Sequence, residues 1–106
     1  MVLRPAIISA AVREPLPGWT DTLSAAGGLS VAGSAGVLEF VYAKSQNVAD
    51  IIPVDYVSNA IIVSTAIKAN KPGLTVIHSN SSDRNPVTWQ EYLDNGFAFI
   101  EKQPIP

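Results

Sequence analysis

Two carboxylates and one imidazole are the side chains of this chain with the clearest capacity for proton transfer. Asp50 and Asp55 lie on either side of Pro53, and His78 is the single histidine among the 106 residues. General acid–base catalysis requires such groups to converge on one space. The sequence favours other roles: Asp55 as the N-cap of a helix, Asp50 as a solvated or loop-bonded carboxylate, and His78 as a structural residue. We therefore predict no catalytic residue in this chain.

The motifs that bind dinucleotides, phosphates or metals are missing from the sequence. Gly28, Gly33 and Gly36 do not have the G-x-G-x-x-G spacing, and neither a P-loop nor a Tyr-x-x-x-Lys pair occurs. The chain has no cysteine, so a Cys/His metal cluster cannot form and we expect no metal site. Arg13 and Lys44 could meet a phosphate-bearing ligand, although solvated surface charge is the usual role of such residues.

The most unusual segment is a loop at residues 13–19 with the sequence Arg-Glu-Pro-Leu-Pro-Gly-Trp. Pro15 and Pro17 fix φ, whereas Gly18 leaves it free. Trp19 follows with a large ring and one N–H donor. Such a stiff loop either lines a pocket for an apolar ligand or lets the tryptophan pack against the edge of the core. The residues alone favour packing, because loop aromatics usually serve it.

Composition indicates one small domain whose surface is poor in charge. Hydrophobic residues make up 47% of the chain and charged residues 15%, against roughly 25% charged residues in typical soluble domains. We therefore expect an interior piece of a larger protein. The net charge of −2 and the absence of a Lys/Arg cluster argue against nucleic-acid binding. The longest apolar run is far too short to span a membrane.

Hydrophobic periodicity and capping residues predict two strand–helix units and a final helix, which indicates an α/β fold. We expect strands at residues 2–4 and 74–78, extended segments at 37–42 and 48–52, and helices at 22–34, 55–70 and 88–102. Pro5 should bend the first strand, and residues 6–12 either extend it or line a crevice. Thr88 and Glu91 form a capping box at the start of the last helix.

The helix at 22–34, with Thr20 or Asp21 as its cap, is predicted to be weak. Gly27, Gly28 and Gly33 each cost about 1 kcal/mol relative to alanine in a helix interior. Small residues at these positions suggest close packing or the close approach of a ligand.

Three segments, residues 2–8, 13–19 and 49–57, resemble the central portion of fatty acyl-CoA reductases. These alcohol-forming enzymes belong to the extended short-chain dehydrogenase/reductase superfamily. The order and spacing of residues 27–29, 33–36 and 85–89 also agree, so the resemblance covers nearly the whole chain. The R-E-P-x-P-G-W string is fairly specific, whereas the Arg-Pro and Val-Asp elements occur widely in the superfamily.

The resemblance implies a partial Rossmann-like fold, the C-terminal part of an NAD(P)-binding domain. This domain would span residues 1–106, with a substrate-binding subdomain at about 13–50, returning Rossmann elements at about 51–79 and a C-terminal helix at about 88–102. It implies reduction of long-chain acyl-CoA to fatty alcohol by two hydride transfers from NADPH, through an aldehyde. The family's glycine-rich turn and catalytic tyrosine and lysine precede the matched region. We therefore expect a central fragment that is inactive without the missing parts of the same enzyme.

The same resemblance suggests which residues contact ligands. The segment that passes beside the nicotinamide contains Pro5, Ala6 and Ile7, which are the expected cofactor contacts. The expected substrate-binding residues, in an apolar acyl channel, are Trp19, Leu23, Leu29 and Phe40. The expected partners are NADPH and a long-chain acyl-CoA. The expected location is intracellular, on the cytosolic side of the peroxisomal or endoplasmic-reticulum membrane, with no membrane segment in this chain.

Two alternatives remain open. The chain could belong to another extended reductase, such as a thioester reductase or a sugar-nucleotide epimerase, but these have no reason to carry the Pro-Leu-Pro-Gly-Trp loop. It could also be a small non-catalytic α/β binding module, which would need a complete core. We expect instead an apolar surface that the chain itself does not cover.

Overall fold

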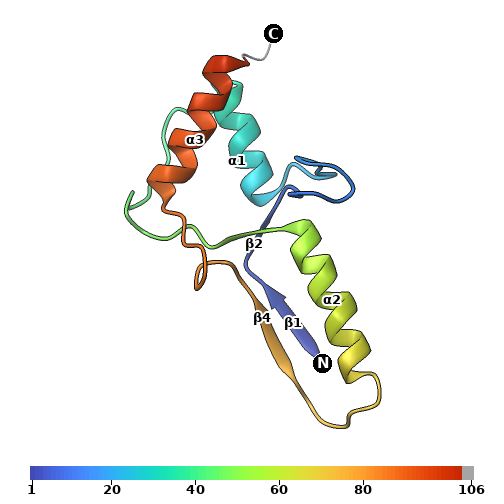
Figure 1. Cartoon of the computed structure of the whole chain (residues 1–106). Helices are drawn as coiled ribbons and strands as arrows, with labels where there is room; N and C mark the ends of the chain where they lie inside the picture. Colours follow the sequence, from blue (N-terminus) through green and yellow to red (C-terminus); the bar gives the residue numbers. More distant parts are fainter. Residues whose placement is uncertain (104–106) are drawn as a thin grey trace.

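Four short strands and three helices make up the computed structural model, which describes residues 1–103 (Figure 1). They are β1 (Val2–Pro5), β2 (Ile7–Ser9), α1 (Ala25–Ser34), β3 (Ile51–Pro53), α2 (Val54–Lys68), β4 (Val76–Ser79) and α3 (Trp89–Lys102). The predicted α/β class is confirmed. The end of the predicted 1–106 domain, residues 104–106, lies outside the described residues.

The strands form two parallel pairs that meet at a bend in the chain. β1 pairs with β4, with Pro5 opposite Ser79, and β2 pairs with β3, with Ile7 opposite Ile51. Pro5 has no N–H, so the ladder cannot pass through it unbroken. Ala6 forms the bend, and its N–H donates to the Ser79 carbonyl at 2.9 Å. The predicted bend is confirmed, and the parallel pairing is that of a partial Rossmann-like fold.

Helix α2 follows β3 without an intervening loop, and this changes the predicted role of Asp55. Pro53, the last strand residue, is the N-cap, with extended backbone at ψ 142°. Asp55 lies inside the first helical turn, so the prediction that it caps the helix is wrong. Because the strand runs directly into the helix, the cap falls on the last strand residue. Val57 and Ser64 face inward from α2, which ends at Lys68.

Helix α1 begins at Ala25, later than predicted, and Ser24 is its N-cap instead of Thr20 or Asp21. The polar side chains before the helix bond to one another: the Thr20 hydroxyl donates to the Thr22 carbonyl at 3.1 Å. Such local bonds offer the backbone a turn in place of a helical start. This turn lies tightly over the helix, because a Cβ at Gly28 would come within 2.1 Å of the Leu23 carbonyl oxygen.

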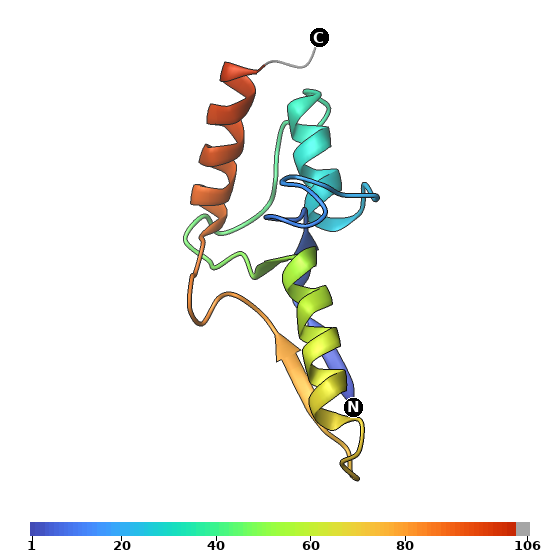
Figure 2. The ribbon, with the colours of Figure 1, turned by 45° about the vertical axis from the view of Figure 1, so that its right-hand side comes forward.

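Helix α3 begins at the predicted capping box. The Glu91 N–H donates to the Thr88 hydroxyl at 3.2 Å, and the Thr88 N–H donates to the Glu91 carboxylate at 2.8 Å. Both views place α3 beside α1, at the opposite end of the molecule from β1, β4 and the end of α2 (Figures 1 and 2). The two helices are joined by a hydrogen bond of 2.8 Å between the hydroxyls of Ser30 and Tyr92.

The extended segment predicted at residues 37–42 is not a strand in the structure. β-branched and aromatic residues favour strands only where a neighbouring strand and a packing surface exist. No strand of residues 1–103 pairs with this segment, and Phe40 remains 86% exposed. The segment predicted at 48–52 is confirmed in part, because Val48 forms a single bridge with Thr88 and β3 starts at Ile51.

The molecule is elongated and leaves much of its apolar surface uncovered. Its radius of gyration is 16.1 Å, against about 13 Å for a compact domain of this length. Its accessible area is 7937 Å², whereas a folded monomer of this mass exposes about 5,700 Å². Large side chains such as Val37 and Leu74 are among those exposed. This agrees with the expectation that the chain does not cover its own apolar side.

Candidate functional site

The Asp55 carboxylate holds the proline-rich loop against the start of α2. Its two oxygens accept hydrogen bonds from the main-chain N–H groups of Val12 at 3.2 Å, Arg13 at 2.9 Å and Glu14 at 3.3 Å. Asp55 is itself buried. A buried carboxylate that accepts several N–H groups is both satisfied and fixed in place. Asp55 therefore acts as an anchor for a loop that precedes it by about 40 residues.

This anchoring changes the acidity of Asp55. Burial raises the pKa of the Asp55 carboxyl, but the hydrogen bonds from Arg13, Val12 and Glu14 together outweigh burial, and the pKa lies below its ordinary value. The charged form accepts these bonds, so the anchor is ionised at neutral pH. An ionised acceptor that is already occupied is poorly suited to general acid–base catalysis.

The loop closes on itself between Ala11 and Trp19. The Gly18 N–H donates to the Ala11 carbonyl at 2.8 Å, and the Ala11 N–H donates to the Trp19 carbonyl at 2.9 Å. Gly18 has φ +82°, a conformation that glycine adopts without strain. The peptide bond between Glu14 and Pro15 is cis. The closed loop brings the Trp19 backbone back beside the end of β2.

A cavity of about 480 Å³, which we call the Trp19 cavity, opens between β2, the Trp19 loop and the start of α1. Ala6 and Ile7, two of the three predicted cofactor contacts, line it together with Trp19, a predicted substrate-binding residue. Pro5 does not line it and lies in β1 opposite Ser79. Residues at the bend between β1 and β2 thus share one space with a tryptophan of the proline-rich loop.

The other three predicted substrate-binding residues lie elsewhere. Leu23 is 67% exposed and Phe40 is 86% exposed, and neither lines the Trp19 cavity. Leu29 lines a separate groove between α1 and α3, which we call the α1–α3 groove. The structure therefore brings together Ala6, Ile7 and Trp19 and keeps Leu23, Leu29 and Phe40 apart from them.

The α1–α3 groove is a large, mostly apolar depression that involves the predicted site residue Leu29. Its volume is about 620 Å³, and α3 supplies half of its wall, including Tyr92, Phe97 and Ile100. The sequence reasoning missed these α3 residues. Their helical spacing on the predicted helix 88–102 was visible, but the neighbour that they face could not be identified from the sequence.

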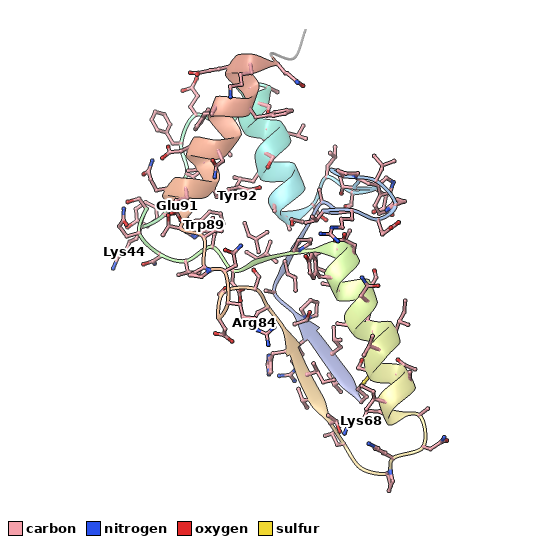
Figure 3. The ribbon with its side chains drawn as sticks, in the orientation of Figure 1. Lys44, Lys68, Arg84, Trp89, Glu91 and Tyr92 are labelled. Carbon is pink, nitrogen blue, oxygen red and sulfur yellow. The ribbon has the colours of Figure 1, made fainter. Side chains whose placement is uncertain are left out.

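Tyr92 and Trp89 shape the base of α3. Their rings meet edge to face, with centroids 6.1 Å apart and planes at 86°. The Tyr92 ring points into the space between α3 and α1 (Figure 3). The Ser30 hydroxyl donates to the Ala26 carbonyl at 3.0 Å and can accept from the Tyr92 hydroxyl. Tyr92 thereby fixes the separation of the two helices at one end of the groove.

The remaining polar candidates form local hydrogen bonds or face the solvent. Asp50 accepts a hydrogen bond from the Ser82 hydroxyl, so its predicted loop-bonded role is confirmed. His78 is exposed in β4 opposite Arg4 and does not line the Trp19 cavity or the α1–α3 groove. Within residues 1–103, no group of three or more His, Cys, Asp or Glu side chains is placed to hold a metal ion.

These features define a parallel α/β protein whose candidate site lies where a strand end meets a proline-rich loop. A family model described as male sterility protein, of the NAD-binding type, matches residues 1–61. The chain therefore belongs to this NAD-binding family. In the part of the chain that the structure describes, we find no helix with the length and apolar character needed to cross a bilayer.

Comparison with curated proteins confirms the resemblance to fatty acyl-CoA reductases. The chain is 37% identical to the probable fatty acyl-CoA reductase 4 of Arabidopsis thaliana, over 99% of this chain and 22% of the relative. It is 40% identical to fatty acyl-CoA reductase 2 of Mus musculus and 34% identical to that of Homo sapiens, over 98% of this chain and 21% of each relative. The chain thus spans about a fifth of the length of these relatives.

Proposed function

We propose that this chain forms part of the nicotinamide- and substrate-facing wall of a fatty acyl-CoA reductase. The complete enzyme reduces a long-chain acyl-CoA to a fatty alcohol with NADPH. In this role the 106 residues supply surfaces and no catalytic group, and the chain alone is inactive. The remaining parts of the same enzyme are its partners. The similarity to reductases over almost the whole chain supports the proposal.

The observation that carries the proposal is the shared lining of the Trp19 cavity. Ala6 follows the carboxyl end of β1, the end at which strands of parallel α/β sheets meet their ligands, and Ile7 is the next residue. Trp19 lies across the same cavity and is held there by the loop that Asp55 anchors. A cofactor ring and an apolar substrate must meet in one water-poor space for hydride transfer.

The residues present fit the nicotinamide end of the cofactor. The cavity of about 480 Å³ is lined by Ala6 and Ile7 together with Trp19. Pro5, which has no N–H, ends β1 and thereby places the bend at Ala6. NADPH supplies a hydride when bound. Ala6 and Ile7 orient the ring edge, and Trp19 excludes water from the reacting carbon.

The substrate side is apolar, as a fatty chain requires. Trp19, Leu23, Leu29 and Phe40 remain our proposed contacts, and the high exposure of Leu23 and Phe40 leaves both free to meet an acyl chain. Each methylene removed from water contributes roughly 0.8 kcal/mol to binding. We also propose an intracellular location, on the cytosolic side of the peroxisomal or endoplasmic-reticulum membrane, which rests on the family resemblance.

The test uses a hybrid reductase in which this chain replaces the matching segment of the mouse relative. We expect the hybrid to form fatty alcohol from palmitoyl-CoA with NADPH, and the 106-residue chain alone to form none. Trp19→Ala in the hybrid should reduce turnover of palmitoyl-CoA, whereas Trp19→Phe should retain most of it. A hybrid that melts cooperatively but reduces no acyl-CoA would overturn the proposal.

A further inference from the structure

The α1–α3 groove has the size and chemistry of a site for an alkyl chain. Its volume of about 620 Å³ lies inside the roughly 300–1,000 Å³ range of small-molecule sites. Aliphatic and aromatic side chains dominate its wall, among them Leu29, Leu93, Phe97 and Phe99, and none of its lining residues is charged. A groove without charge or donor-rich walls selects against polar ligands, because their hydrogen bonds to water would be lost.

The groove borders a more polar cavity. Val87 and Tyr92 line both the groove and a neighbouring cavity of about 570 Å³ whose wall includes Arg84, Asn80 and Asn85. We call this second space the Arg84 cavity. The Arg84 side chain lies below Tyr92, near the end of β4 (Figure 3). An apolar space that borders one with a cation and two amides suits a ligand with a hydrocarbon tail and a polar end.

The Arg84 cavity is in turn a neighbour of the candidate reaction site. Ser9 lines both the Arg84 cavity and the Trp19 cavity. Because neighbouring spaces share lining residues, the Arg84 cavity lies between the Trp19 cavity and the groove. A long flexible molecule that reaches from the Trp19 cavity to the groove would therefore pass Ser9, Arg84 and Tyr92.

We propose that the α1–α3 groove binds the tail of the acyl thioester and that its width limits the accepted chain length. The polar end of the substrate lies toward Arg84 and Ser9. This inference deepens the proposed function and rests on it, because it assumes an acyl-CoA substrate. Other occupants of the groove, such as a helix from outside these 106 residues, are outcomes of the test below.

Two glycines set the width of the groove. Gly33 in α1 and Gly96 in α3 line it from opposite sides, and a Cβ built on either one meets no atom within 4 Å. Larger side chains at these positions therefore meet open space, and because both residues line the groove we expect such side chains to fill part of it. Leucine also favours helix more than glycine does, so the same change does not weaken α1 or α3.

The first experiment locates the tail directly on the chain as it exists. The 106-residue chain is incubated with a palmitoyl-CoA carrying a photoreactive diazirine on its terminal carbon, irradiated, digested and sequenced by mass spectrometry. We expect the label on α1 and α3 residues that line the groove. Labelling that falls mainly outside α1 and α3, or that is evenly spread, would overturn the inference.

The second experiment compares substrates within one protein, so that losses common to all substrates cancel. In the hybrid reductase, Gly33→Leu and Gly96→Leu should each lower the ratio of kcat/KM for palmitoyl-CoA over octanoyl-CoA at least tenfold. Each methylene kept out of an apolar site lowers affinity by about fourfold. Ala98→Leu, a change in the same helix at an exposed residue outside the groove, should leave the ratio unchanged.

The outcomes separate the inference from the function on which it rests. A hybrid that reduces both substrates, with a ratio that no glycine variant changes, overturns the groove as the tail site and leaves the reductase function intact. A folded hybrid that reduces neither substrate overturns the proposed function. In that case, labelling of the groove in the first experiment still identifies it as an alkyl-binding site.

Discussion

The Trp19 cavity and the α1–α3 groove are built in opposite ways. The wall of the Trp19 cavity is fixed by directional bonds, since one buried carboxylate accepts three main-chain N–H groups of the loop. The groove is held by the Tyr92 hydroxyl, which meets the Ser30 hydroxyl and the Ala26 carbonyl of α1, and its wall is otherwise mostly apolar. Hydride transfer demands fixed geometry, whereas an alkyl chain can slide along an apolar wall. The difference agrees with the roles that we propose for the two regions, a rigid reacting end and an adaptable tail end.

The largest expected effect comes from removing the Asp55 carboxylate, which anchors the proline-rich loop. Asp55→Ala leaves the N–H groups of Val12, Arg13 and Glu14 without their acceptor, so the loop should open locally. We expect amide hydrogen exchange at these three residues to accelerate by on the order of tenfold or more. In the hybrid reductase, turnover should fall as well. Glu101→Ala, which removes a carboxylate from the exposed end of α3, serves as the control. Unchanged exchange would show that Asp55 does not hold the loop.

The same anchor predicts a pH dependence that the groove should lack. The pKa of Asp55 is lower in the folded chain than its ordinary value, so the folded state binds fewer protons. Its contribution is fully present above an unfolded pKa of about 4 and is lost as the pH falls through the lower folded pKa. Loop protection measured by hydrogen exchange should therefore be flat from neutral pH to about pH 5 and fall below that. Asp55→Asn should remove this acid-dependent step.

Two glycines of α1 lie in different surroundings: Gly28 packs tightly against the 22–24 turn, whereas Gly33 faces open space at the groove. A Cβ at Gly28 would approach the Leu23 carbonyl oxygen to 2.1 Å, whereas a Cβ at Gly33 meets nothing within 4 Å. We expect Gly28→Ala to destabilise the chain by about 1–3 kcal/mol. Gly33→Ala should instead stabilise it by up to about 1 kcal/mol. Urea unfolding followed by circular dichroism measures both, and equal effects at the two positions would contradict the packing of the 22–24 turn.

The sequence predicts features that depend on neighbouring residues, but not contacts between residues far apart in the chain. The capping box at Thr88 and Glu91 is a local pattern, and the structure contains it. The Asp55 anchor joins groups 42 positions apart, and Ser30 meets Tyr92 across 62 positions. Local sequence patterns do not relate residues so far apart. The prediction for Asp55 therefore rested only on its position at the start of a helix, and it assigned the residue as a helix cap. The β-rich segment predicted to be extended at 37–42 forms no strand for the same reason, since β propensity requires a neighbouring strand that residues 1–103 do not provide.

A smaller effect on stability is expected from changes to the capping box at the start of α3. The Thr88 hydroxyl accepts the Glu91 N–H at 3.2 Å and closes the first turn of α3. Thr88→Ala should cost about 1 kcal/mol of stability, and Thr88→Ser should restore most of it. Helix content by circular dichroism should fall while hydrogen exchange at Val12 to Glu14 stays unchanged. If hydrogen exchange at that loop rose as well, the loop and α3 would unfold as one cooperative unit, and the Trp19 cavity and the α1–α3 groove would not be separate regions.

The smallest expected effect tests the polar contacts of Tyr92 across the groove. Tyr92→Phe keeps the ring against Trp89 but removes the hydroxyl that meets the Ser30 hydroxyl at 2.8 Å and the Ala26 carbonyl at 3.4 Å. Loss of an exposed hydrogen bond lies at the low end of the range of about 0.5–1.5 kcal/mol, and Ser30→Ala should give a similar value. Because both changes remove the same bond, the double variant should be less destabilised than the sum of the single variants. Strict additivity would show that the hydroxyls act independently and that apolar packing alone sets the width of the groove.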